Sequence, residues 1–399
     1  MKKKLLAVAV AGALAAPGFA LAQSSVTISG VFKASLENLR IGSPGAGRIG
    51  LNTSENRVAD DSSRILFNVV EDLGGGLQAI GQADLRMPIA SGNVIAMSGN
   101  THVGLRSASL GRIFVGRQDV HYGNTESDMS VLAGDLRADS ISLLAFMANG
   151  VAIANASRTP NIIHYTTPNF GGFTAIVAYS TGPTGGATGQ PNVSNVGAAA
   201  GVAATAAQQS DLSSSIRKGN AFTFNPNYAA ANWQVGYSYW NMKPDSGQLL
   251  SASAAQLDQR SNKLYGSFKI AGFKIGLSWD KSKLTGNSGA TAGVRTNERT
   301  AWSLPISYMM GNNGFHFHYT KARDDTVTTT QDGAKMVALS YQYTLSKRTS
   351  VGLTYAKITN DAGATYNFFT TSSLGNSTGA GVAAGEDPRL FAGTLRHAF

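Results

Sequence analysis

The sequence predicts an all-β protein: a transmembrane antiparallel up-and-down β-barrel of sixteen strands. Three observations predict this fold class. Segments of about ten residues alternate apolar and polar side chains, short Gly/Asn turns separate many of them, and only 14% of the 399 residues are charged. A typical soluble protein has about 25% charged residues. Because side chains on a strand alternate between its faces, such a barrel can present apolar rows to lipid and keep polar rows inside.

The N-terminal segment differs from the rest of the chain. Residues 2–4 are lysines, an apolar run follows as far as Ala16, and residues 20–22 give the small-x-small pattern of a cleavage site. This pattern is typical of a secretory signal peptide. We therefore expect a signal peptide at residues 1–22 and a barrel domain at residues 23–399. No later stretch approaches the roughly 20 continuous apolar residues of a spanning helix, which excludes a helical membrane bundle.

The alternating segments predict the strands in order. Phe273, Ile275 and Leu277, for example, alternate with polar or small residues, so they share one face. The even number of strands is the one that single-chain bacterial barrels require. Pro305 lies inside a predicted strand, where we expect a bulge, an edge-like site or a shifted register. The sixteen predicted strands are residues 25–37, 63–71, 77–87, 100–108, 112–119, 160–168, 173–180, 219–229, 232–242, 262–270, 273–281, 299–310, 314–322, 334–345, 349–358 and 389–399.

Turns and loops predict the two ends of the barrel. Short turns fall at residues 74–76, 109–111, 169–172, 311–313 and 346–348, whereas the other connections are long and polar. Residues 181–217 are low in complexity and are expected to form a mobile extracellular loop. A soluble β-sandwich also alternates, but its outer face carries charge, whereas here the polar rows hold short Ser, Thr, Gly, Asn and Gln side chains. Such rows favour a wet interior.

Four motifs resemble one known family. They are Ser63-Arg64 followed by EDLGGGLQAI at residues 71–80, LGRIFVGRQ at residues 110–118, NIIHYTTPNFGGF at residues 161–173 and the ending LRHAF. Together they resemble the trimeric general porins of Gram-negative betaproteobacteria, and they extend to the last residue. The resemblance implies a bacterial outer-membrane barrel, exported through the periplasm. It also implies a water-filled channel for passive diffusion of ions and small hydrophilic solutes.

The same resemblance implies partners. They are two further copies in a homotrimer, outer-membrane lipid and the barrel-assembly machinery. Phe391 and Leu395 share one strand face with Phe399, and the last of these resembles the C-terminal assembly signal of the family. A terminal aromatic residue in the interfacial girdle also suits closure of the barrel against the first strand.

The resemblance further implies where solutes are selected. Porins narrow the channel with an inward-folded third loop, which corresponds here to residues 120–157. The predicted basic wall consists of Lys33, Arg64, Arg106 and Arg158, with Arg86 and Arg117 as further candidates. The predicted acidic loop and wall consist of Asp84, Glu126, Asp128, Asp135 and Asp139. Each single basic residue can instead be a solvated rim residue or a phosphate contact to outer-leaflet lipid.

Charge and motif content separate the function classes. Without the three signal lysines the count is 30 Lys+Arg against 23 Asp+Glu, a net charge of +7. This excess suits anionic lipid or an anion-favouring lumen, and we expect weak anion selectivity; nucleic-acid binding is not expected in an exported chain. No cofactor, metal site or catalytic residue is predicted. The alternatives are an adhesive or structural barrel and, less favoured, a barrel enzyme.

Overall fold

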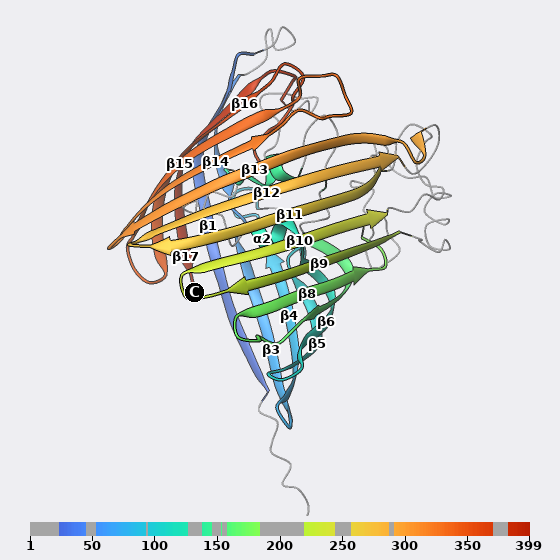
Figure 1. Cartoon of the computed structure of the whole chain (residues 1–399). Helices are drawn as coiled ribbons and strands as arrows, with labels where there is room; N and C mark the ends of the chain where they lie inside the picture. Colours follow the sequence, from blue (N-terminus) through green and yellow to red (C-terminus); the bar gives the residue numbers. More distant parts are fainter. Residues whose placement is uncertain are drawn as a thin grey trace, which may run out of the picture.

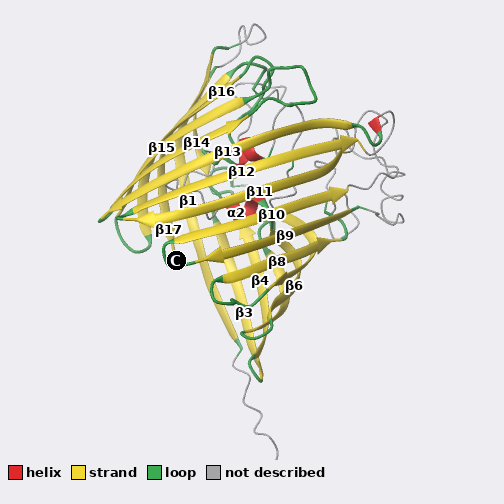
Figure 2. Cartoon of the chain, in the orientation of Figure 1, coloured by secondary structure: helices red, strands yellow, loops and turns green. Residues whose placement is uncertain are grey.

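The computed structural model describes residues 24–44, 53–92, 95–126, 138–145, 153, 158–183, 219–243, 257–286, 291–369 and 382–399. Figure 1 shows that the described strands wrap around a common axis, and Figure 2 shows how few helices accompany them. The expected signal peptide and nearly all of the expected mobile loop at residues 181–217 lie outside the described residues.

All described strand pairs are antiparallel and belong to one sheet that closes on itself. The strands are β1 (Ser25–Gly42), β2 (Ser54–Asp60), β3 (Arg64–Gly74), β4 (Leu77–Arg86), β5 (Thr101–Ser107), β6 (Gly111–Asp119), β7 (Arg158–Thr166), β8 (Phe173–Ser180), β9 (Asn220–Ala229), β10 (Trp233–Lys243), β11 (Leu257–Ile270), β12 (Phe273–Gly286), β13 (Arg295–Met310), β14 (Asn313–Ala322), β15 (Ala334–Thr344), β16 (Thr349–Asn360) and β17 (Asp387–Ala398).

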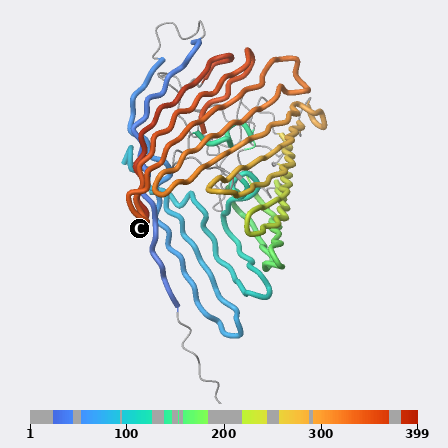
Figure 3. The backbone as a smooth tube through the Cα atoms, turned by 60° about the vertical axis from the view of Figure 1, so that its left-hand side comes forward, coloured from blue at the N-terminus to red at the C-terminus, as the bar shows by residue number. Residues whose placement is uncertain are grey.

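Strands β2 and β3 are two segments of one strand position. β1 pairs Val31 with Arg64 of β3 and Ala34 with Asp60 of β2, so the register moves by one residue where residues 61–63 intervene. This is the geometry of a bulge. The 17 labelled strands therefore fill sixteen positions (17 − 1 = 16). β1 pairs with β17 along its other edge and closes the barrel, as Figure 3 shows for the blue and red ends of the chain.

The predicted fold class is confirmed: the chain is a closed antiparallel barrel, and each of the sixteen predicted strands coincides with an observed one. β2 and the outer ends of β11, β12 and β13 were not predicted. At Pro305 the ladder to β12 is interrupted between Ile306 and Ser303, yet the register on either side is the same. The proline thus removes local pairing, as expected for a residue without an N–H, and produces no bulge.

The apolar rows lie on the outside of the barrel. Large apolar side chains are exposed along every second position, for example Leu277 at 57% and Leu339 at 51%. The alternate positions face inward and carry short polar groups, among them Ser238, Ser278 and Thr354, each at most 1% exposed. The apolar rows therefore face outward and do not pack against one another inside the barrel.

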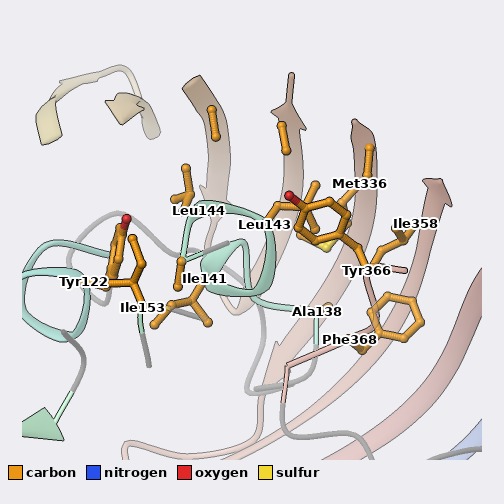
Figure 4. Packing of buried hydrophobic residues seen from close by; sticks show 14 of the residues in the cluster. Tyr122, Ala138, Ile141, Leu143, Leu144, Ile153, Met336, Ile358, Tyr366 and Phe368 are labelled. Carbon is orange, nitrogen blue, oxygen red and sulfur yellow. The ribbon is translucent and has the colours of Figure 1, made fainter. Parts of the chain in front are cut away.

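A buried apolar cluster joins the connection between β6 and β7 to several strands of the barrel. Two short helices lie in this connection, α2 (Tyr122–Glu126) and α3 (Ile141–Leu144). In Figure 4, Leu143 lies near Met336 of β15, and Tyr366 and Phe368 of the connection after β16 complete the same buried cluster. No helix in the described part of the chain is both long and apolar enough to span a bilayer.

Candidate functional site

Two arginines face each other across the β3–β4 hairpin. Arg64 is directly opposite Arg86 in the register, and the Asp84 carboxylate lies between their guanidinium groups. Asp84 Oδ2 is 2.8 Å from Arg86 Nη2 and 3.8 Å from Arg64 Nη1. Ile65 and Leu85 occupy the alternate, outward positions, so strand alternation turns the three charged side chains inward. The sequence-based prediction that Arg64 and Asp84 face inward rests on the same alternation of side chains along the strand.

The tight turn between these strands sets their pairing. Gly74, Gly75 and Gly76 have φ angles of 84°, 60° and 79°, a region that L-residues with side chains rarely adopt. Asp72 Oδ1 also accepts a hydrogen bond from the Gly74 N–H at 2.9 Å. Because the turn fixes the register of the hairpin, it determines that Arg64 and Arg86 end up opposite each other.

A second arginine–aspartate pair lies beside the first. Arg158 Nε, at the start of β7, is 3.2 Å from Asp119 Oδ1, at the end of β6. Asn100 connects the two pairs: its side-chain Nδ2 donates to Asp119 Oδ2 at 2.7 Å, and its backbone N–H donates to Asp84 Oδ2 at 3.3 Å. The Ser98 carbonyl oxygen accepts from Arg158 Nη1 at 3.3 Å.

A fourth arginine completes the group. Arg117 Nε donates to the same Ser98 carbonyl oxygen at 3.1 Å. We call Arg64, Arg86, Arg117 and Arg158, with Asp84 and Asp119, the arginine cluster. Its formal charge is +2 (4 − 2 = +2), because arginine stays protonated in proteins. Arg64 and Arg86 are directly opposite each other and share the Asp84 carboxylate, so their positive charges are close enough to repel each other. A passing anion would relieve this repulsion.

The start of the β6–β7 connection is bound to three distant strands. The His121 ring nitrogens lie 2.8 Å from the hydroxyls of Ser238 on β10 and Ser261 on β11. The Tyr122 hydroxyl lies 3.1 Å from Ser261 Oγ and 3.2 Å from Ser282 Oγ on β12. These three serines are on inward rows. We call these contacts the serine anchor.

Burial determines the protonation of the serine anchor. Desolvation, and then the positive charge of Lys263, hold the pKa of His121 well below its usual value, so the imidazole is neutral at pH 7. Burial, and then the Asp280 carboxylate, raise the pKa of the Tyr122 hydroxyl well above its usual value. His121 has a φ angle of 42°, a left-handed conformation that turns the chain sharply after β6.

The serine anchor includes a serine, a histidine and an aspartate, but not in a catalytic order. The Ser261 hydroxyl lies between its two partners, donating to Asp280 while contacting His121. In a hydrolytic triad the histidine lies between the serine and the acid, and the serine is accessible to substrate. Here all three side chains are at most 1% exposed. This set is therefore a structural anchor.

A buried arginine holds the second helix of the connection. Arg299 Nη2 on β13 donates to the Leu144 carbonyl oxygen at 3.1 Å, and the guanidinium lies 5.5 Å from the centre of the Tyr366 ring. Burial raises the pKa of Tyr366 to about 12. The described parts of the connection thus contact the inward rows of the strands from β10 to β15.

Among the other predicted basic residues, Lys33 and Arg106 lie outside the arginine cluster. Lys33 is on an inward position of β1, beside the bulge, where its backbone N–H donates to Ser63 Oγ at 2.9 Å. Arg106 lies near the short turn, where its Nε donates to Gln78 Oε1 at 2.7 Å. The structure therefore brings Arg64, Arg158 and Asp84 together, and it places Arg106 near the short turn instead.

Among the predicted loop acids, the structure describes the side chain of Asp139 alone. Asp128 and Asp135 lie outside the described residues, and the side chain of Glu126 does as well. Asp139 is described, and its Oδ1 accepts the backbone N–H of Ile141 at 3.0 Å at the start of α3. Sequence reasoning missed Asp119 and Asn100 as site residues. Their strand positions could have found them, because Asp119 is the last residue of β6 and Asn100 directly precedes β5, the strand beside it.

The terminal residue closes the sheet. Phe399 and Gly30 exchange two backbone hydrogen bonds, at 3.0 and 3.1 Å, and the Phe399 ring lies 5.2 Å from that of Phe32. A Cβ on Gly30 would come within 2.5 Å of both the Phe399 ring and the Arg64 carbonyl oxygen. Glycine at position 30 therefore makes room for this contact.

Known proteins share this fold and sequence pattern. The chain is 33% identical over 182 residues to outer membrane porin protein 32 of Delftia acidovorans. The matched region covers 45% of this chain and 50% of that protein. It is also 24% identical over 365 residues to major outer membrane protein P.IB of Neisseria gonorrhoeae. This match covers 88% of this chain and 91% of that protein. Most of the curated relatives match over about half of their length.

Solved structures agree with the fold. The anion-selective porin from Comamonas acidovorans superposes with a TM-score of 0.69 at 21% identity, covering 94% of this chain and 100% of that one. OmpT of Vibrio cholerae in its trimer form gives a TM-score of 0.62 at 12% identity, covering 94% and 99%. The model of the Gram-negative porin family matches residues 7–363. The chain therefore belongs to the Gram-negative porins, which are β-barrels of the bacterial outer membrane.

Proposed function

We propose that the chain forms a water-filled channel through which ions and small hydrophilic solutes diffuse passively, with a weak preference for anions. The arginine cluster is the observation that carries this proposal. Four guanidinium groups and only two carboxylates, from β3, β4, β6 and β7, lie together and are linked by ion pairs and by hydrogen bonds to Asn100 and to the Ser98 carbonyl oxygen. Rings or stripes of arginine on a channel wall favour anions. The similarity to a porin described as anion-selective supports the same preference.

The β6–β7 connection is proposed to narrow the channel opposite the arginine cluster. The serine anchor and the Arg299–Leu144 contact support inward folding, because their barrel partners are on inward rows of β10 to β13. Such a loop would leave the wall that carries the arginine cluster facing the open part of the lumen. Solutes would then pass a positively charged wall in a narrow space, where electrostatic interactions are less screened than in bulk water.

A homotrimer is proposed as the functional assembly. The similarity in fold to a porin solved in a trimer form supports it. Trimers of independent channels would give conductance steps in groups of three in planar bilayers. Insertion events that each give one conductance step would contradict the trimer, while the proposal of a channel would stand.

The reversal potential in a salt gradient tests the anion preference. Arg64→Ala removes one inward positive charge, so we expect the anion-to-cation permeability ratio to fall by about twofold. The matched control is Lys335→Ala, which removes one positive charge from the outer face of β15 and should leave the ratio unchanged. An unchanged ratio in Arg64→Ala would remove the arginine cluster from ion selection, and the absence of any conductance in the wild type would refute the channel.

A further inference from the structure

A sulfur atom and an imidazole nitrogen border one small space inside the barrel, near the short turn between β13 and β14. Gly314 on β14 is directly opposite Met309 on β13. A Cβ built on Gly314 would lie 2.9 Å from His316 Nε2 and 3.0 Å from Met309 Sδ. Both atoms therefore face the space that the missing side chain of the glycine leaves open. We call Met309, Gly314 and His316 the methionine–histidine site.

Strand alternation places this site on the inner side of the sheet. Phe315 is 46% exposed on the outer face and is directly opposite Tyr308. Gly314 and His316 are the neighbours of Phe315, and Met309 is the neighbour of Tyr308, so all three occupy inward positions. Met309 is itself 44% exposed beside the short turn. An ion that enters this end of the barrel can therefore reach its sulfur.

The imidazole of His316 lacks the partners that a buried polar group normally has. Both of its ring nitrogens are buried, and neither has a hydrogen-bond partner among the described residues. Buried polar side-chain atoms are hydrogen-bonded in the large majority of cases, so an exception needs an explanation, and a bound ion is one. The residues directly opposite His316 are Ser307 and Ser340, and the Ser340 hydroxyl lies 2.9 Å from Thr354 Oγ1 instead. The imidazole is thus available as a ligand.

The donor atoms select a soft metal ion. Thioether sulfur and neutral imidazole nitrogen suit Cu(I), whereas Ca²⁺ and Mg²⁺ take oxygen ligands and carboxylates above all. Residues 301–322 and 334–345, which surround the site, contain no aspartate or glutamate. Lys274 is directly opposite Ser307 on the next strand, and its positive charge opposes a divalent ion more strongly than a monovalent one. A soft, monovalent ion therefore fits best.

Such an ion does not need a large set of ligands. Within the described part of the chain there is no group of three or more His, Asp or Glu side chains that could hold a metal ion. Cu(I) and its redox-stable analogue Ag(I) accept low coordination numbers, so a thioether and an imidazole are sufficient. The chain has no cysteine, so no thiolate competes for a soft ion.

We propose that the methionine–histidine site binds a soft monovalent metal ion of the Cu(I) class, with Met309 Sδ and His316 Nε2 as its ligands. Because the site lies on the inward side of β13 and β14, the ion would be held within the barrel near its short-turn end. The inference requires only the folded barrel and is independent of whether the barrel conducts ions.

Calorimetric titration of the intact protein with Ag(I), in detergent micelles and chloride-free buffer, tests this proposal. The wild type should have one high-affinity site per chain. Met309→Leu and His316→Gln should each weaken binding at least about tenfold, because even the loss of an outer-shell partner of a metal ligand costs that much. The matched controls, Met310→Leu and His397→Gln, change the same residue types at the same end of the barrel and should bind like the wild type.

Three results would overturn the proposal. They are the absence of saturable Ag(I) binding by the wild type, wild-type affinity in Met309→Leu or in His316→Gln, and binding of Zn²⁺ as tight as that of Ag(I). The last would identify an imidazole site with no preference for a soft ion. Conductance plays no part in this measurement, so failure of the channel and failure of the metal site are distinguishable. Retained electrophoretic heat shift shows that each variant is folded.

Discussion

Individual charges in the arginine cluster are held by their neighbours. Asp84 is 1% exposed and binds two guanidinium groups and one backbone N–H, so its carboxylate fixes where Arg64 and Arg86 present their charge. Asp119 does the same for Arg158. A channel wall with fixed charges attracts anions without first reorganising, which is the physical advantage of embedding acids among arginines.

Strand residues of this site could be predicted, and loop residues could not. The period of two along a strand determines which face Arg64 and Asp84 occupy, and the glycine turn determines their neighbours. Arg158 and Asp119 were brought together by a strand pair whose register shifts near Gly116, which composition does not reveal. Glu126 and Asp139 follow no periodic pattern, so their sequence positions carry no information about direction.

Gly30 gives a prediction at the scale of one residue. Gly30→Ala forces a Cβ against the Phe399 ring and the Arg64 carbonyl oxygen, each at 2.5 Å. We expect overpacking to lower the free energy of unfolding by about 1–3 kcal/mol, measured by urea unfolding in detergent micelles. Gly81→Ala is the control, because its Cβ would meet its nearest atoms at an ordinary 3.8 Å. Equal stability of the two variants would show that the closing contact tolerates a side chain.

At the scale of elements, the strands are longer than the lipid-facing alternation indicates. β11 and β12 continue past the aromatic girdle as far as Leu257 and Gly286, where lipid no longer requires an apolar row. The hydrogen-bond ladder persists there while the sequence alternation disappears. β2 was missed for the same reason: among its outward positions only Val58 is a large apolar residue. Sequence patterns therefore locate the membrane-embedded part of each strand better than its ends.

The serine anchor gives a prediction for the β6–β7 connection. The buried His121 has a pKa well below that of a detached, solvated imidazole, which is about 6.5. The detached form therefore binds a proton first, so the contribution of the anchor is intact above pH 6.5 and decreases as the pH falls below it. Lys263 opposes protonation in the anchored state, and Asp280 is the acid that faces the same group.

Hydrogen–deuterium exchange measures this effect. Exchange of a peptide covering residues 121–126, corrected for the intrinsic pH dependence of the chemistry, should show less protection at pH 5 than at pH 7.5. His121→Gln keeps a polar side chain that does not titrate in this range, so its pH dependence should be smaller than that of the wild type. Equal pH dependence in both proteins would assign the effect to another group.

At the scale of the whole molecule, the distinction between a lipid-facing side and a water-facing side of the sheet explains how the residues are distributed. Exposed apolar rows, inward polar rows and the inward positions of Arg64 and Arg86 all follow from a closed sheet with lipid on one side and water on the other. Closure leaves no unpaired sheet edge in the membrane.

Accessibility of adjacent positions on one strand tests this distinction most directly. The sequence has no cysteine, so single cysteines report without background. Gln234 faces inward on β10 and the neighbouring Val235 faces outward with 44% exposure. In lipid vesicles, a charged, water-soluble thiol reagent should label Gln234→Cys and not Val235→Cys, and a fluorophore attached at Val235→Cys in detergent before reconstitution should be quenched by lipid-borne nitroxide. Labelling of Val235→Cys from water, with protection of Gln234→Cys, would contradict the account.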